Sequence, residues 1–182
     1  MSEKLVILDR DGVINRDSKD FVKNADEWLP LPGSIDAIAA LSAAGYKIAI
    51  ASNQSGLARS LFDNQALQSM HAKFRTLVEE AGGKVDYIVI CPHGPDDGCD
   101  CRKPEPGLYR QIAEHFDTSL DGVPIVGDSI RDLEAAVAAG AKPILVRTGN
   151  GVSTETRLHG KLEAVPVFDD LAAFARSLVA DL

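Results

Sequence analysis

Two aspartates, Asp9 and Asp11, directly follow the first apolar run of the chain, Leu5–Leu8. Side chains two residues apart on an extended segment leave the same face, so these carboxylates lie close together. They repel each other, and a cation or a raised pKa on one of them must compensate. The pair is a candidate nucleophile and general acid bridged by a divalent metal. The alternative interpretation is an acidic turn, since Asp is a common turn residue.

A third carboxylate, Asp128, follows the short apolar run 125–127, and Asp132 lies four residues further along the chain. Mg²⁺ prefers oxygen ligands and usually keeps several waters beside a few carboxylates. Asp9, Asp128 and the backbone carbonyl of Asp11 would provide such ligands, and Asp132 would orient them. The alternative is that Asp128 caps the helix that follows it.

Candidate phosphate ligands follow two other apolar runs. Ser52 lies where a predicted strand turns toward a helix, and backbone N–H groups at such a turn can hold a phosphate. A simple Ser-Gly turn is the alternative there. Lys103 is bounded by Pro104 and Pro106, which stiffen the loop and fix the direction of the ammonium group. Arg102 beside it can grip a second anionic or hydroxyl group of the leaving group, unless the two are merely a solvated basic pair.

All three cysteines of the chain lie near one histidine, in the pattern C-x-H-x5-C-x-C formed by Cys91, His93, Cys99 and Cys101. Three thiolates and one imidazole complete a tetrahedral zinc site and leave no position open for water. The sequence therefore predicts a structural zinc that fixes the loop presenting Arg102 and Lys103. Buried free thiols or an oxidised Cys99–Cys101 pair are the alternatives.

Short apolar runs alternate with helical patterns along the chain. The expected strands are 5–8, 48–51, 87–90, 124–126 and 144–146, the expected helices are 34–44 with Ser34 as N-cap, 67–78, 108–116 and 133–139, and segments 165–168 and 171–178 close the chain. This order predicts an α/β fold with a parallel sheet covered by helices on both faces. Ligands bind beyond the carboxyl ends of such strands, where every polar cluster described above falls. Gly149–Gly151 is expected to be a mobile loop.

Composition favours one soluble domain. The chain has 182 residues, of which 45% are hydrophobic and 25% charged. We therefore expect a single domain, 1–182, with a zinc-binding loop at 91–103. A net charge of −8 disfavours nucleic acid as a partner but permits a small phosphate ester. The expected absence of a signal peptide, a membrane span and a disulfide framework favours a cytoplasmic protein, with a monomer as the default.

These motifs, in this order, resemble those of the haloacid-dehalogenase (HAD) superfamily of phosphotransferases. The four superfamily motifs match Asp9-x-Asp11, Ser52, Lys103 and Gly127-Asp128-x-x-x-Asp132. The resemblance implies a Rossmann-like fold, Mg²⁺-dependent hydrolysis of a phosphate ester and an aspartyl-phosphate intermediate. A large cap domain is not expected, because a predicted helix and strand use most of the segment between Asp11 and Ser52.

Finer motifs resemble the heptose-bisphosphate phosphatases of this superfamily, at residues 9–15, 52–59 and 99–104. This resemblance implies removal of the C7 phosphate of a heptose 1,7-bisphosphate in lipopolysaccharide precursor synthesis. It also implies that the substrate pocket is lined by Asp17, Ser18, Lys19, Asp20, Asn53, Gln54 and Ser55. The short spacer 94–98 is more similar to histidinol-phosphate phosphatases, which are the alternative.

Two other classes of protein remain as competing hypotheses. One is a zinc-stabilised binding module that keeps a degenerate phosphatase fold and binds phosphate esters without turnover. All four motif positions are filled, which disfavours this class. The other is a phosphatase that processes nucleic-acid ends, which would need a basic groove and is disfavoured by the net charge of −8.

Overall fold

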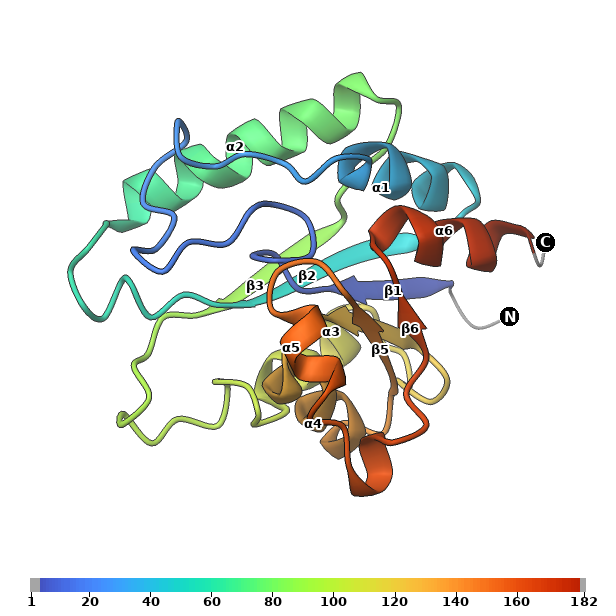
Figure 1. The fold of residues 1–182 in the computed structure, drawn as a ribbon. Coiled ribbons are helices and arrows are strands. Elements are labelled where there is room, and N and C mark those ends of the chain that lie inside the picture. Colours follow the sequence, from blue (N-terminus) through green and yellow to red (C-terminus); the bar gives the residue numbers. More distant parts are fainter. Residues whose placement is uncertain (1–3, 181–182) are drawn as a thin grey trace.

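A six-stranded parallel sheet forms the centre of the protein, in the spatial order β3-β2-β1-β4-β5-β6 (Figure 1). The structure is a computed structural model and describes residues 4–180. The strands are β1 (Leu5–Leu8), β2 (Lys47–Asn53), β3 (Tyr87–Cys91), β4 (Pro124–Gly127), β5 (Lys142–Val146) and β6 (Val167–Phe168). The predicted fold class is confirmed, and the continuous apolar runs reflect a sheet that is covered on both faces.

Helices pack on both faces of this sheet (Figure 1). One face is covered by α1 (Ser34–Ala43), α2 (Asn64–Glu80) and α6 (Leu171–Ala180), and the other by α3 (Gly107–His115) and α4 (Ile130–Ala138). The short helix α5 (Gly151–Glu155) and a 3-10 turn (Gly160–Leu162) precede β6. Among residues 4–180, no helix combines the length and the apolar character needed to cross a bilayer.

Strand β1 divides its side chains between the two layers. Val6 and Leu8 belong to the core beneath α1, α2 and α6, whereas Leu5 and Ile7 belong to the core against α3 and α4. All four are at most 3% exposed. Alternate side chains of a strand point to opposite faces, so a short strand can be apolar throughout only when both faces are covered.

Strands that follow β1 in the sequence are added to the sheet on both sides of it. From β1 the sheet continues to β2 and β3 on one side and to β4, β5 and β6 on the other. A crevice forms outside the carboxyl ends of parallel strands at such a switch point. Asp9, Asn53 and Asp128 stand at or just beyond the ends of β1, β2 and β4, so the fold brings these three segments together.

The predicted N-cap of α1 and the capping alternative for Asp128 are both wrong. Gly33, with a φ of 75°, precedes α1 in place of Ser34, whose hydroxyl donates to the carbonyl of Ile14 at 2.7 Å. Ser129 caps α4, so the capping alternative for Asp128 is wrong. The loop predicted at Gly149–Gly151 is shorter than expected, because Gly151 begins α5, and the backbone N–H of Asn150 donates to Asp128 Oδ2 at 2.8 Å.

Candidate active site

The ammonium group of Lys103 is buried between the ends of three segments. Its Nζ donates to Asp9 Oδ1 at 2.9 Å, to Asp132 Oδ1 at 2.7 Å and to the carbonyl of Ala51 at 2.8 Å. The three bonds use all three donors of the ammonium, and the residue is only 2% exposed. Burial lowers the pKa of Lys103, but Asp132 and Asp9 outweigh it and hold this pKa well above its usual value. Lys103 is therefore a fixed cation at the predicted nucleophile.

Asn53, at the end of β2, fixes the backbone of Lys103. Its Oδ1 accepts from the Lys103 N–H at 3.0 Å, and its Nδ2 donates to the Lys103 carbonyl at 3.1 Å. The resemblance implies that Asn53 lines the substrate pocket, and the structure places it there with its side-chain amide bonded to Lys103. This pair of bonds holds the predicted zinc loop against the sheet.

Carboxylates outnumber cations at this site. Oxygens of Asp9, Asp128 and Asp132 lie within 4.8 Å of one another, beside the single ammonium of Lys103. Burial, followed by the charge of Asp132, raises the pKa of Asp9 well above its usual value and that of Asp128 to about 7. An additional cation would relieve this repulsion, so the cluster fits a divalent metal.

Asp132 is occupied by the protein itself. Its Oδ1 accepts from Lys103, and its Oδ2 accepts from the Ser129 hydroxyl at 2.9 Å and from the N–H groups of Ser129 and Asp128 at 3.1 and 3.2 Å. Burial would raise the pKa of Asp132, but Lys103 lowers it below its usual value. Asp132 therefore orients Lys103 and the start of α4.

The predicted magnesium ligands keep oxygens that are free for a metal. Asp128 Oδ2 accepts from Asn150, and Asp9 Oδ1 accepts from Lys103. Asp128 Oδ1, Asp9 Oδ2 and the backbone carbonyl of Asp11 accept no hydrogen bond within residues 4–180. Three oxygen ligands with room for water are the chemistry that Mg²⁺ prefers. The donor set thus fits the metal predicted from the sequence.

Two glycines make room for the Asp128 carboxylate. Gly12 and Gly149 have φ angles of 86° and 57°, and a Cβ atom built on either would overlap Asp128 Oδ2. The Thr148 hydroxyl also donates to the Gly12 carbonyl at 2.7 Å, which ties the segment after β5 to the segment after β1. The position of Asp128 therefore depends on two residues without side chains.

Asp11 is held by donors on both of its oxygens. Asn15 Nδ2 donates to Oδ1 at 2.7 Å, Gln54 Nε2 donates to Oδ2 at 2.8 Å, and the Arg10 guanidinium bonds both oxygens. Burial would raise the pKa of Asp11, but Arg10, followed by Asn15 and Gln54, lowers it below its usual value. Gln54, which the resemblance places in the substrate pocket, also donates to the Ser52 hydroxyl at 2.8 Å.

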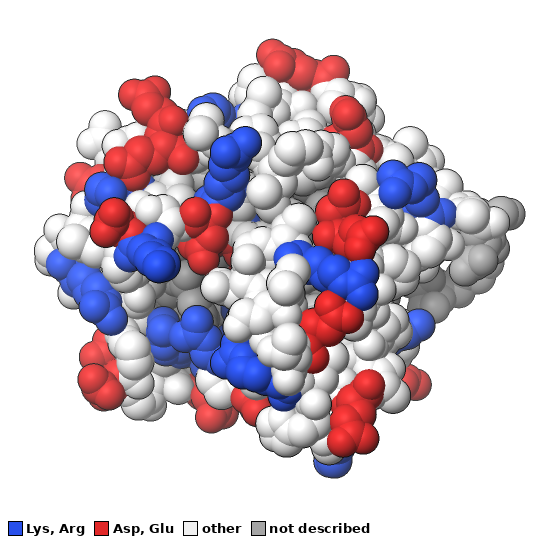
Figure 2. Space-filling view, in the orientation of Figure 1, with Lys and Arg blue, Asp and Glu red and all other residues white. Residues whose placement is uncertain are grey.

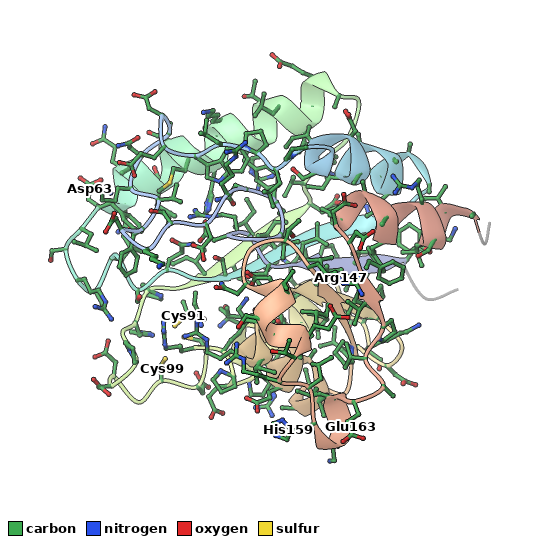
Figure 3. All side chains as sticks on the ribbon, viewed as in Figure 1. Asp63, Cys91, Cys99, Arg147, His159 and Glu163 are labelled. Atoms are coloured by element: carbon green, nitrogen blue, oxygen red, sulfur yellow. The ribbon has the colours of Figure 1, made fainter. Side chains whose placement is uncertain are left out.

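The four predicted zinc ligands are gathered at the end of β3. Cys101 Sγ lies 3.1 Å from Cys91 Sγ and 3.3 Å from His93 Nδ1, and Cys91 Sγ lies 3.7 Å from Cys99 Sγ. The four ligand atoms lie within 4.8 Å of one another, and Figure 3 shows Cys91 and Cys99 on this loop. Burial raises the pKa of the Cys91 and Cys101 thiols, so a metal cation is needed to keep them as thiolates. All three cysteines are free thiols, and the set fits a tetrahedral zinc.

Known proteins match this chain along nearly its whole length. A family model described as polynucleotide kinase 3 phosphatase matches residues 4–135, and one described as HAD-hydrolase-like matches residues 100–174. The chain is 58% identical over 176 residues to D-glycero-β-D-manno-heptose-1,7-bisphosphate 7-phosphatase of Pseudomonas putida, which covers 97% of this chain and 99% of the relative. The chain belongs to the heptose-bisphosphate phosphatase family.

Solved structures of this family share the fold. The D,D-heptose 1,7-bisphosphate phosphatase of Bordetella bronchiseptica, solved with magnesium and phosphate, has a TM-score of 0.95 and 55% identity over 98% of this chain and 99% of that one. The protein from Burkholderia thailandensis has a TM-score of 0.76 and 42% identity over 97% and 99% of the two chains. This chain is accordingly a phosphatase with a HAD-like fold.

One pocket of the phosphatase collects most of the residues expected to act on substrate. The expected residues that line it are Asp9, Asp11, Asp17, Ser18, Ser52, Asn53, Gln54, Ser55, Arg102, Lys103 and Asp128. Lys19 and Asp20 do not line it, and both are exposed. The Asp20 N–H instead donates to the Ser18 hydroxyl at 3.1 Å, so the turn directs these two side chains to solvent.

Five pocket residues were not anticipated: Phe21, Val22, Ser129, Arg131 and Asn150. Arg131 lies in the first turn of α4, where a cation is disfavoured by the helix dipole unless an anion binds nearby. Asn150 comes shortly after β5, so the rule that strand ends line the site applies to it as well. Phe21 and Val22 carry no comparable signal, because apolar residues in a loop are usually read as packing.

Loss of a zinc ligand should weaken this phosphatase indirectly. Cys99→Ala is expected to lower bound zinc and to reduce kcat by between about tenfold and a hundredfold, since a misplacement of about 1 Å at a reacting group can cost that much. Zinc content is measured by elemental analysis beside the rate of phosphate release. Asp100→Ala, at an exposed neighbour in the same loop, is the matched control and should retain both zinc and rate. Full activity in zinc-free protein would contradict a positioning role for the metal.

Proposed function

We propose that this phosphatase removes the 7-phosphate of D-glycero-β-D-manno-heptose 1,7-bisphosphate. The observation that carries the proposal is the Asp9–Lys103–Asp128 cluster at the strand ends of a chain 58% identical to a relative named for this reaction. The reaction would serve the synthesis of nucleotide-activated heptose for the lipopolysaccharide core. We further propose a monomer in the cytoplasm, where the three free thiols would stay reduced.

Asp9 would attack the phosphorus atom in line and displace the sugar oxygen. One oxygen of the Asp9 carboxylate would attack while the other faces the metal, and Lys103 Nζ holds Oδ1 at 2.9 Å. The aspartyl phosphate formed on Asp9 would then be hydrolysed by water. Lys103 stays in place through both steps, because Asp132 and the Ala51 carbonyl fix its other two N–H groups. Its charge would offset that of the phosphoryl oxygens.

The metal that fits this site would be held by Asp9, Asp128 and the Asp11 carbonyl. When bound, Mg²⁺ would offset the negative charge shared by the carboxylates and the phosphoryl group. Asp128 is kept in position for this task by the N–H and side-chain amide of Asn150, at 2.8 and 3.2 Å from its Oδ2. Ser52, whose side chain is held by Gln54, would bind one phosphoryl oxygen.

Asp11 would donate a proton to the departing sugar oxygen and then accept one from the attacking water. Its lowered pKa means that the carboxyl is ionised in the free site, whereas the first step requires it to be protonated. A phosphate dianion bound nearby would raise the pKa of Asp11. We therefore expect proton uptake to accompany substrate binding.

Arg102 and Arg131 are the proposed partners of the second phosphate of the substrate. Both line the pocket, and neither forms an ion pair with a carboxylate within residues 4–180. Burial, followed by the charge of Arg131, lowers the pKa of Arg102, so the two guanidinium groups repel each other. A bound dianion between them would relieve that repulsion.

A comparison of substrates tests the proposal. With Mg²⁺ present, kcat/KM is measured on heptose 1,7-bisphosphate, histidinol phosphate and a DNA 3′-phosphate. We expect a preference for the heptose of about a hundredfold, or about 2.7 kcal/mol of transition-state discrimination. The DNA substrate tests the match to the polynucleotide kinase 3 phosphatase family model. We expect slow hydrolysis of it, because acidic and basic side chains are interspersed on the face in Figure 2 and do not form a continuous basic surface there. A preference for histidinol phosphate or for DNA would overturn the heptose assignment.

A further inference from the structure

We propose that His71, on helix α2, is a positioning residue that acts on the reaction through Arg10. It lies outside the pocket lining, and no step of the mechanism above uses it. The proposal rests on the proposed function, because the reacting group that His71 would ultimately orient is Asp11. It stands on a chain of hydrogen bonds that leads from α2 to the Asp11 carboxylate.

The Arg10 guanidinium is the middle member of this series of hydrogen bonds. Arg10 is fully buried, and its Nε and Nη2 donate to Asp11 Oδ1 at 3.2 and 3.0 Å. Nη2 also lies 3.2 Å from Asp11 Oδ2. A planar guanidinium facing both oxygens of a carboxylate fixes the plane of that carboxylate. The orientation of Asp11 therefore depends on what holds the far side of the guanidinium.

His71 is the partner on that far side. Its Nε2 lies 3.3 Å from Arg10 Nη1, and no other hydrogen bond of Nη1 occurs within residues 4–180. A guanidinium can only donate, so His71 Nε2 must accept and its ring proton must lie on Nδ1. Burial, followed by the charges of Arg10 and Arg75, lowers the pKa of His71 to about 4, against an opposing effect of Asp11. The neutral ring required for this bond is therefore the form present at neutral pH.

Helix α2 is fixed against the segment that follows β1, so the helix that carries His71 is held in place. Lys73 Nζ donates to the carbonyls of Ala25 and Trp28, both at 2.7 Å, and the rings of Trp28 and Phe74 lie 5.4 Å apart. In Figure 1 this segment crosses α2 before it enters α1. A side chain on such a helix can hold a buried guanidinium in one orientation, which is what proton transfer by Asp11 requires.

Two substitutions separate the hydrogen bond from the packing. His71→Leu keeps an apolar body but removes the acceptor and leaves Nη1 of the buried Arg10 without a partner. His71→Gln restores an acceptor, because Gln Oε1 reaches about as far from the backbone as His Nε2. We expect the Leu variant to be impaired and the Gln variant to be rescued.

The leaving group of the substrate supplies a readout that packing alone would not change. A sugar oxygen must be protonated as it departs, whereas nitrophenolate departs without a proton from the enzyme. For His71→Leu we expect kcat/KM to fall about tenfold on heptose 1,7-bisphosphate and less than threefold on p-nitrophenyl phosphate. The tenfold loss is a fraction of the rate factor that a general acid typically contributes. Asp11→Asn sets the scale and should separate the two esters more strongly.

Phe74→Leu is the matched control on the same helix. It weakens the packing of α2 against Trp28 without touching Arg10, so it should lower the thermal unfolding temperature and change both rates in parallel. Suppose that Asp11→Asn lowers kcat/KM more on the heptose ester than on the nitrophenyl ester. Equal losses of kcat/KM on the two esters for His71→Leu, or no rescue by His71→Gln, would then overturn the role of His71. If Asp11→Asn also fails to separate them, the proton-transfer role of Asp11 is wrong, and the proposal for His71 falls with it.

Discussion

Asp9→Asn is expected to abolish phosphate release while leaving the protein folded. The substitution removes the attacking carboxylate, and loss of a nucleophile typically costs about 10⁴-fold or more in kcat. Asn keeps the volume of Asp and retains an oxygen that can accept from Lys103 Nζ, which lies 2.9 Å from Asp9 Oδ1. It also removes one charge from a cluster in which burial and Asp132 already raise the pKa of Asp9.

The folded state of this variant is measured beside its rate. Thermal unfolding is expected to shift by no more than about 4 °C, which corresponds to about 1 kcal/mol for a chain of this length. Asp121→Asn, the same chemical change at an exposed residue in a turn before β4, is the matched control and should retain full turnover. The variant protein is assayed freshly purified, because deamidation of Asn would regenerate Asp9. Unchanged phosphate release would exclude Asp9 as the nucleophile.

Lys103→Met is expected to impair both activity and stability. It removes the ammonium that contacts Asp9 and Asp132 at 2.9 and 2.7 Å and leaves both carboxylates without their buried cation. We expect kcat/KM to fall about 10³-fold, as for loss of a preorganised donor at a transition state. Breaking a buried ion pair by removing one partner typically costs about 3–5 kcal/mol, so the free energy of unfolding should fall by a similar amount.

A double variant separates the two losses. Lys103→Met combined with Asp132→Asn removes a cation and an anion together, so chemical denaturation should show part of the lost stability recovered. Activity should stay low, because the cation at the phosphoryl group is still missing. Denaturation midpoints of the two single variants and the double variant give the coupling between Lys103 and Asp132. Recovered turnover in the double variant would contradict a role for Lys103 in the reaction itself.

The strand ends explain why so much of this site could be predicted. Leu5–Leu8 and residues 125–127 are too short and too apolar for anything but buried strands, and the polar residues that follow them must meet at one edge. The same reasoning placed Ser52 and Lys103 in the pocket, and the spacing of the cysteines was sufficient to predict the four-ligand cluster.

The hydrogen bonds inside the site could not be predicted in the same way. Asn53 and Gln54 are polar residues of a strand end, but only the packed structure reveals that they bond Lys103 and Asp11. Lys19 and Asp20 follow two residues that do line the pocket, and a local turn sends them outward. Arg131 reaches the pocket from a helix, a direction that a rule based on strand ends does not cover.

The loop between β3 and Lys103 is fixed at its two ends and makes few contacts at its tip, residues 95–98. Cys91 ends β3 and Asn53 clamps the backbone of Lys103, whereas residues 95–98 are exposed and their hydrogen bonds within residues 4–180 run to Gly94 alone. Insertions or deletions at this tip would leave the ammonium at Asp9 where it is. The tip also borders a groove shared with Arg102 and Arg131. New substrate preferences can therefore evolve at this tip, or be engineered by grafting loops of different length, while the contact between Lys103 and Asp9 is kept.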